Sequence, residues 1–311
     1  MMKKRAIFGL LATMLGAGGA QAAWFDGNDA LTSAHQRLLN GHTAASIEAM
    51  IEAWQQPNLS AAKQDHLAQL LALAITEDCG RSLSQKTLPD WLSNISVRRE
   101  TIQTTSRVYY RLQISGESPA GVNALTLKQW PDQTVMRGEF SPAQQHRWRL
   151  VKDGLSDPIS EGLYQLTVES VSGNTWSSWL LLTQPQPRQT LSWKDTRSWH
   201  IAPFDDFNST CQRPFLSLNL YPHNQPDGAP IWSAEKHKRL PTQLPILDVP
   251  NGQYWFSVAL IERRWQGALS IEEVQRIGRA IDLPDLDPEV LDRPEVLDRM
   301  APSRSDKQSD E

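Results

Sequence analysis

The sequence predicts an α+β protein with a small N-terminal helical array, two tandem immunoglobulin-like antiparallel β-sandwiches, a short C-terminal helix and a disordered acidic tail. Two observations support this fold class. Helical periodicity gives way to period-2 alternation near Pro89, and one strand motif occurs twice, as Gly162-x-Tyr164 and as Gly252-x-Tyr254. In each copy a polar turn ends at the glycine and a strand follows, which is typical of a sandwich strand with a tyrosine corner. Tyr164 and Tyr254 are therefore expected to be structural corners.

Residues 1–22 are typical of a secretory signal peptide. Lys3, Lys4 and Arg5 precede an apolar run, and Ala20-Gln21-Ala22 is a small-x-small cleavage site. The run is shorter than the roughly 18 apolar residues of a membrane anchor. We therefore expect an exported, periplasmic mature protein without a transmembrane segment.

The sequence of residues 23–88 predicts a helical domain of three short amphipathic helices. The first ends at Asn40-Gly41, a good C-terminal signal, and Ser60 can cap the third. Because so few helices cannot bury their own apolar faces, we expect them to pack on the neighbouring sandwich.

The two predicted sandwiches cover residues 89–184 and 188–266. The first contains about seven short period-2 segments separated by turn residues, which is the pattern of a sandwich. Gln184-Pro185-Gln186-Pro187 has the composition of a short, stiff linker. The second sandwich has fewer clear strands and ends with the repeated glycine–tyrosine motif.

Residues 267–282 predict a capping helix. Ser270 and Glu273 fit a capping box, Leu269 and Val274 fit a hydrophobic staple, and apolar residues recur at helical spacing. Residues 283–311 predict a disordered acidic tail, because their composition cannot form a core. The alternative for this tail is a docking peptide, since a Pro-Glu-Val-Leu-Asp-Arg unit occurs twice in succession.

The chain has two cysteines, Cys79 and Cys211. An even pair in an exported protein most often forms a disulfide, which here would join the helical domain to the second sandwich. The alternatives are two free buried thiols or a redox pair, although no Cys-x-x-Cys motif is present.

No motif in the sequence indicates catalysis, a cofactor or a metal. The histidines lack metal-ligand spacing, and nucleophile elbows and glycine-rich phosphate loops are absent. The precursor carries 31 basic and 35 acidic residues, and no basic stripe is visible, which argues against nucleic-acid binding.

Tryptophan is the one compositional excess, with 12 residues. Most are expected in the core, but some alternate away from inward-facing neighbours and could bind a protein partner or stack on sugar rings. An arginine pair adjoins the last of them. The candidate binding surface comprises Trp176, Trp179, Trp255, Arg263, Arg264 and Trp265.

The layout of signal peptide, helical start, Gly-x-Tyr strands and one distant cysteine pair resembles an uncharacterised family of exported gammaproteobacterial proteins, a domain of unknown function. Members are encoded beside envelope-stress two-component systems, so the resemblance implies a periplasmic location and a role in cell-envelope homeostasis. The first functional hypothesis is a non-enzymatic interaction protein that binds an envelope protein. The alternatives are a module that binds peptidoglycan or exopolysaccharide, and an envelope hydrolase.

Overall fold

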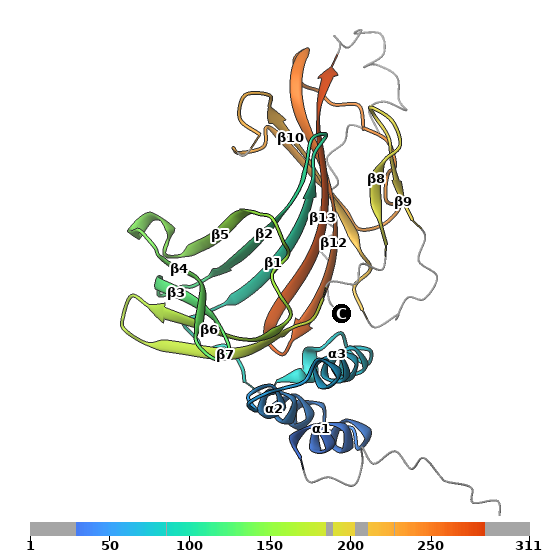
Figure 1. The fold of residues 1–311 in the computed structure, drawn as a ribbon. Helices are drawn as coiled ribbons and strands as arrows, with labels where there is room; N and C mark the ends of the chain where they lie inside the picture. The colour runs from blue at the N-terminus through green and yellow to red at the C-terminus, as the bar shows by residue number, and fades with distance from the viewer. Residues whose placement is uncertain (1–28, 85, 185–188, 203–210, 227, 284–311) are drawn as a thin grey trace, which may run out of the picture.

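The computed structural model describes residues 29–84, 86–184, 189–202, 211–226 and 228–283. The predicted signal peptide and nearly all of the predicted acidic tail lie outside the described residues. The described chain is mostly β-structure with helices at its N-terminal end, as expected (Figure 1).

The N-terminal helices agree with the prediction. They are α1 (Ala30–Leu39), α2 (Thr43–Trp54) and α3 (Ala61–Ile75), followed by the short η1 (Arg81–Leu83). The Ser60 hydroxyl accepts a hydrogen bond from the Lys63 N–H at the start of α3. The core of the helices also contains Leu163 and Leu181 from the following sheet, which confirms that the array packs on its neighbour.

The strands alternate with turns through the rest of the described chain. They are β1 (Asn94–Gln103), β2 (Val108–Glu117), β3 (Val122–Gln129), β4 (Gln133–Glu139), β5 (Arg147–Leu155), β6 (Gly162–Ser170), β7 (Thr175–Leu182), β8 (Leu191–Trp193), β9 (Trp199–Ile201), β10 (Phe215–Pro222), β11 (Trp232–Lys236), β12 (Gly252–Gln266) and β13 (Leu269–Leu283), with a short η2 (Pro142–Gln144) between β4 and β5.

These strands form three sheets. The large sheet has the order β11-β10-β12-β13-β1-β2-β5, the small sheet has the order β4-β3-β6-β7, and β8 pairs with β9. Neighbours in the large sheet are antiparallel except β1 and β13, which are parallel. One apolar core lies between the large and small sheets, and another includes residues of β8, β9 and the β10–β12–β13 part of the large sheet.

The prediction of two separate sandwiches is wrong for the second half of the chain. Residues 94–182 do form seven strands in two sheets around a shared core. Strands β10 to β13, however, extend the large sheet, because β13 pairs with β1 from Ile95↔Leu269 to Gln103↔Ile277. Period-2 alternation locates strands but does not say which strands pair, so this join was not visible in the sequence.

The predicted capping helix at 267–282 is also wrong, because this segment is strand β13. Ile271, Ile277 and Ile281 are an even number of residues apart, so they lie on one face of a strand as well as on one side of a helix. All three are buried. Since β13 is paired on both sides, by β12 and by β1, sheet hydrogen bonding overrides the local capping signals.

Both predicted tyrosine corners are present. The Tyr164 hydroxyl donates a 2.6 Å hydrogen bond to the Ser160 carbonyl, and the Tyr254 hydroxyl donates a 2.8 Å bond to the Pro250 carbonyl. Each corner follows a glycine with positive φ, 146° and 148°, a backbone region that favours glycine. The two corners lie at the starts of β6 and β12, in different sheets.

Cys79 and Cys211 form the predicted disulfide. It joins the residues after α3 to the residues before β10. Main-chain hydrogen bonds reinforce this join, since the N–H groups of Trp265 and Gly267 donate to the carbonyls of Cys79 and Gly80 at 2.8 and 2.9 Å. The helices are thus fixed to the β12–β13 turn.

Candidate binding site

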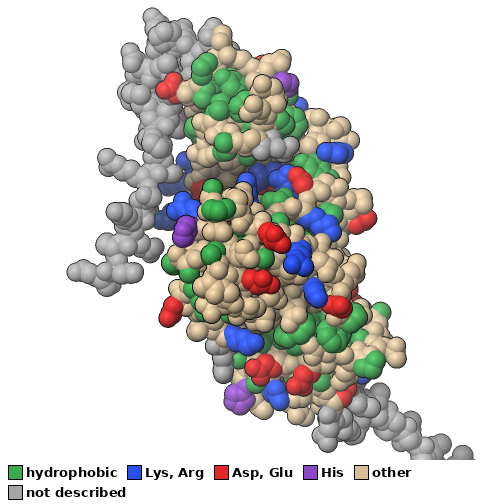
Figure 2. Space-filling view, turned by 90° about the vertical axis from the view of Figure 1, so that its left-hand side faces the viewer, with side chains coloured by type: hydrophobic (Ala, Val, Ile, Leu, Met, Phe, Trp, Pro, Cys, Tyr) green, Lys and Arg blue, Asp and Glu red, His purple; other side chains and the backbone are tan. Residues whose placement is uncertain are grey.

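One face of the large sheet, here called the open face, forms a hollow of about 620 Å³. Strands β1, β2, β5, β10, β12 and β13 contribute to it. Five arginines and two carboxylates line it, together with the aromatic side chains of Tyr109, Tyr221 and Trp255. Figure 2 shows basic side chains gathered in a hollow across the middle of the molecule.

Two buried carboxylates organise the arginines of the open face. Glu272 on β13 accepts hydrogen bonds from Arg98 at 2.6 Å and from Arg263 at 2.6 and 2.8 Å. Neighbouring strands bring these groups into register, because Arg98 and Arg263 are both paired with Glu272. A carboxylate with two guanidinium partners holds both arginines in fixed positions.

The second carboxylate, Glu100 on β1, is only 3% exposed and lies among three arginines. It is 3.2 Å from Arg276 and 3.7 Å from each of Arg98 and Arg111. Arg111 also pairs with Asp153 at 2.5 Å. Partial burial opposes ionisation of Asp153, but the hydrogen bonds from Arg111 and the Gly154 N–H hold the pKa of Asp153 below its usual value.

Arg107 and Arg149 add positive charge at the rim of the hollow. Both are exposed, and the Arg107 guanidinium lies 4.6 Å from the Tyr109 ring centroid. Because arginines outnumber carboxylates in the lining, the hollow has an excess of positive charge. Such a surface attracts acidic groups.

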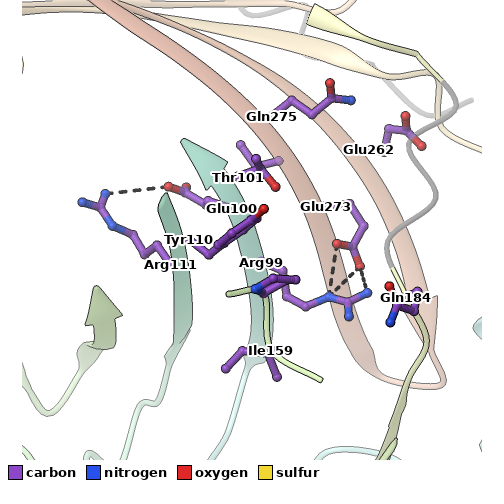
Figure 3. A pocket seen from close by; sticks show the side chains of 12 residues that line it. Arg99, Glu100, Thr101, Tyr110, Arg111, Ile159, Gln184, Glu262, Glu273 and Gln275 are labelled. Atoms are coloured by element: carbon purple, nitrogen blue, oxygen red, sulfur yellow. Dashed lines mark hydrogen bonds and ion pairs between the residues drawn. The ribbon is translucent and has the colours of Figure 1, made fainter. Parts of the chain in front are cut away.

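The opposite face of the large sheet carries two apolar cores and a belt of polar side chains between them. The belt, shown in Figure 3, includes Arg99, Tyr110, Glu262, Glu273 and Gln275. Arg99 on β1 donates to the carboxylate of its strand partner Glu273 at 2.9 and 3.1 Å. Paired charges of this kind can be buried because each satisfies the other.

The belt also anchors the chain where it crosses from the small sheet to β8. Arg99 donates a 2.7 Å hydrogen bond to the Thr183 carbonyl, and Gln275 donates to the Gln189 carbonyl and accepts from the Leu191 N–H at 3.2 Å. Both ends of the predicted proline linker are therefore fixed by side chains of the large sheet.

Arg264 on β12 lies on the same face of the sheet as Glu262 but differs from the residues of the belt. Its Nη1 and Nη2 atoms are buried and make no hydrogen bond within the described residues. Burial lowers the pKa of Arg264 to about 10; the charge of Glu273 opposes this shift, and that of Arg99 adds to it. The guanidinium is therefore still charged at neutral pH. Arg264 lies in the wall of a cleft of about 690 Å³, which α3, Thr183–Gln184, Cys211 and β12 border.

The residues of the predicted binding surface do not form one surface. Trp255 and Arg263 lie on the open face, as alternation predicted for Trp255, and Arg264 lies on the opposite face. Trp265 is half-buried, and the Arg81 guanidinium carbon lies 3.7 Å from the centroid of its ring.

Trp176 and Trp179 point to opposite faces of β7, as predicted, but both are half-buried. Trp176 packs against the core between the two sheets, whereas Trp179 packs against the helical core. Each ring is therefore partly covered by one of these cores.

Sequence reasoning missed the charged network of the open face, above all Arg98, Glu100, Glu272 and Arg276. The run Arg98-Arg99-Glu100 inside a period-2 segment was a usable signal, because adjacent strand residues face opposite sides and one face had to hold buried charge. Their partners are about 170 residues away in the sequence, which periodicity cannot reveal.

Among the described residues, no group of three or more His, Cys, Asp or Glu side chains could hold a metal ion. The Ser198 hydroxyl donates a 2.5 Å hydrogen bond to the Asp195 carboxylate. Within the same residues, no helix is long and apolar enough to cross a membrane.

Comparisons with known proteins give a family without a described activity. No curated protein matches the sequence. One solved structure with some similarity is titled "Biofilm associated protein - BSP domain"; the match has 8% identity and a TM-score of 0.21, and covers 61% of this chain and 29% of the other. A likeness of that size supports no conclusion. Residues 24–282 match a family of proteins of unknown function, and the chain therefore belongs to the DUF2861 family.

Proposed function

We propose that this chain is a non-enzymatic interaction protein of the periplasm, which binds an acidic segment of an envelope protein in the hollow of the open face. A role in cell-envelope homeostasis would fit the resemblance seen in the sequence. The observation that carries the proposal is the hollow of about 620 Å³ with its excess of arginine.

The composition of the hollow supports a protein partner. Arginine, tyrosine and tryptophan are enriched at protein interfaces, where they supply most of the binding energy. Buried Glu100 and Glu272 hold several arginines in place before a partner arrives. This preorganisation lowers the entropic cost of binding.

Location in the periplasm rests on the N-terminal sequence, with Lys3, Lys4 and Arg5 before an apolar run and a small-x-small site at Ala20-Gln21-Ala22. The Cys79–Cys211 disulfide fits an oxidising compartment. Fractionation of cells that express the full chain tests the location, and a mature protein found in the cytoplasm would contradict it.

The binding proposal is tested by site-specific photo-crosslinking. A photoreactive residue replaces Gln113, which lines the hollow, and the crosslinked periplasmic protein is identified by mass spectrometry. The charge reversal Arg149→Glu should weaken crosslinking about tenfold, because one arginine of an interface contributes 1 kcal/mol or more. Arg137→Glu is the matched control, since Arg137 is also exposed but lies on β4 in the small sheet.

Two outcomes would contradict the proposal. One is a crosslink at Gln113 that Arg149→Glu and Arg137→Glu reduce equally, because the charge of the hollow would then not matter. The other is a hollow that yields no crosslink in periplasmic extract.

A glycan-binding role is the alternative, and one observation favours it. Trp130 is 39% exposed and lies edge-on to Trp179, with ring centroids 5.9 Å apart. An exposed aromatic ring of this kind can stack on a sugar. Retention on insoluble peptidoglycan that Trp130→Ala abolishes and Arg149→Glu does not would favour this role over the protein partner.

A further inference from the structure

The buried guanidinium of Arg264 lacks hydrogen-bond acceptors among the described residues, whereas the two nearby arginines of the sheet both pair with carboxylates. Arg99 and Arg263 have Glu273 and Glu272, whereas Nη1 and Nη2 of Arg264 make no hydrogen bond to any residue that the structure describes and have almost no exposed surface. Water therefore does not replace the missing acceptors. An unsatisfied buried charge costs several kcal/mol, so such a group calls for an explanation.

The position of Arg264 in a cleft supplies that explanation. The cleft volume of about 690 Å³ falls within the usual range of small-molecule sites, roughly 300–1,000 Å³. This cleft is distinct from the hollow of the proposed function, because no residue lines both cavities.

The other charges of the cleft limit the kind of anion that it can accept. Four carboxylates line it, of which Glu273 is paired with Arg99. Asp65 on α3 and Glu161 before β6 make no hydrogen bond or ion pair within the part of the chain that the structure describes. A phosphate dianion would be repelled by these carboxylates, whereas a single carboxylate can pair with Arg264 alone.

The cleft thus offers one buried cation without an acceptor and two carboxylates that pair with no other group among the described residues. We propose that it binds a small zwitterion, an amino acid or a short peptide, whose carboxylate pairs with Arg264 once the guanidinium turns toward the cleft, and whose ammonium group faces Asp65 and Glu161. A guanidinium suits this role because it binds a carboxylate through two parallel hydrogen bonds.

The test is calorimetric titration of the folded mature protein at neutral pH with trialanine, trialanine amide, N-acetyl-trialanine and inorganic phosphate. Trialanine should bind. Blocking its carboxylate as the amide should weaken binding about tenfold or more, because a hydrogen-bonded charge pair is lost. Acetylation of the amino group should weaken binding by a smaller factor, and phosphate should not compete.

Arg264→Met should abolish trialanine binding, and Arg264→Lys should weaken it about tenfold, because a lysine keeps the charge but not the bidentate geometry. Arg137→Gln is the control, because Arg137 is exposed on β4, lines neither cavity, and its replacement should leave binding unchanged. Melting temperatures of all variants establish that each one is folded.

Three results would overturn the inference. They are equal binding of the acid and the amide, binding that survives in folded Arg264→Met, and no binding of trialanine at about 10 mM, a concentration that fills a millimolar site. Phosphate binding that depends on Arg264 would overturn the zwitterion assignment and indicate a phosphate site. None of these results bears on crosslinking in the hollow, so the two proposals fail independently.

Discussion

Replacement of Glu100 by glutamine should destabilise the protein strongly, because Glu100 is the buried carboxylate among three arginines. The change keeps the size of the side chain and removes only its charge. Glu100 lies 3.2 Å from Arg276 and 3.7 Å from Arg98 and Arg111. At an effective dielectric constant of about 20, each contact contributes a gross attraction of about 5 kcal/mol.

Desolvation offsets most of this gross attraction. Removal of one partner from a buried ion pair costs about 3–5 kcal/mol in measured cases, because the remaining charge is left uncompensated. Glutamine can still accept the hydrogen bond from Arg276, so we expect a loss near the lower limit, about 3 kcal/mol in the free energy of unfolding.

Urea denaturation of the oxidised protein, followed by tryptophan fluorescence, measures this loss. Glu139→Gln is the control; Glu139 is exposed on β4, and its replacement should change the free energy of unfolding by less than about 0.5 kcal/mol. The double variant Glu100→Gln/Arg276→Met should lose less than the two single variants combined, because both remove one interaction. A loss below about 1 kcal/mol for Glu100→Gln would refute the reasoning, since the arginines would then be stable without the carboxylate.

Three further changes test the framework. Loss of the disulfide in Cys79→Ser/Cys211→Ser should cost up to about 5 kcal/mol by chain entropy, given its separation of 132 residues; equal denaturation midpoints with and without reductant would contradict this. Tyr164→Phe should lower the free energy of unfolding by about 1 kcal/mol, and Tyr254→Phe should lower it less, because the side chain of Tyr164 is buried. Burial also raises the pKa of Tyr164, so its contribution is present below about pH 10 and declines as pH rises through the native pKa, which spectrophotometric titration checks. Arg264→Met should leave the free energy of unfolding unchanged or raise it by about 1–4 kcal/mol. A markedly lower melting temperature would contradict this, because the guanidinium would then stabilise the protein without a ligand.

The elements that depend on neighbours in the sequence were predictable. Three helices, their ends at Asn40 and Ser60, and the two tyrosine corners follow from patterns that span a few residues. The pairing of Cys79 with Cys211 was predictable for a different reason, since the chain has no other cysteines.

The candidate sites were only partly predictable. Alternation placed Trp255 on the face away from Tyr254 and Phe256, which is the face of the hollow. Excess tryptophan, by contrast, drew attention to Trp176 and Trp179, which pack against cores on the two faces of β7. The carboxylates that order the arginines could not be inferred, because their partners come from the far end of the chain.

The sequence by itself determined the three N-terminal helices, many of the strands, the two corners and the disulfide, because each follows from local periodicity, turn chemistry or simple counting. Only the tertiary structure decided that residues 269–283 are a strand, that this strand joins the two halves in one sheet, and that Arg264 lies buried without an acceptor. The physical reason is that helix and strand patterns overlap at Ile271, Ile277 and Ile281, and the choice between them is made by hydrogen bonds to β1, whose sequence lies about 170 residues earlier.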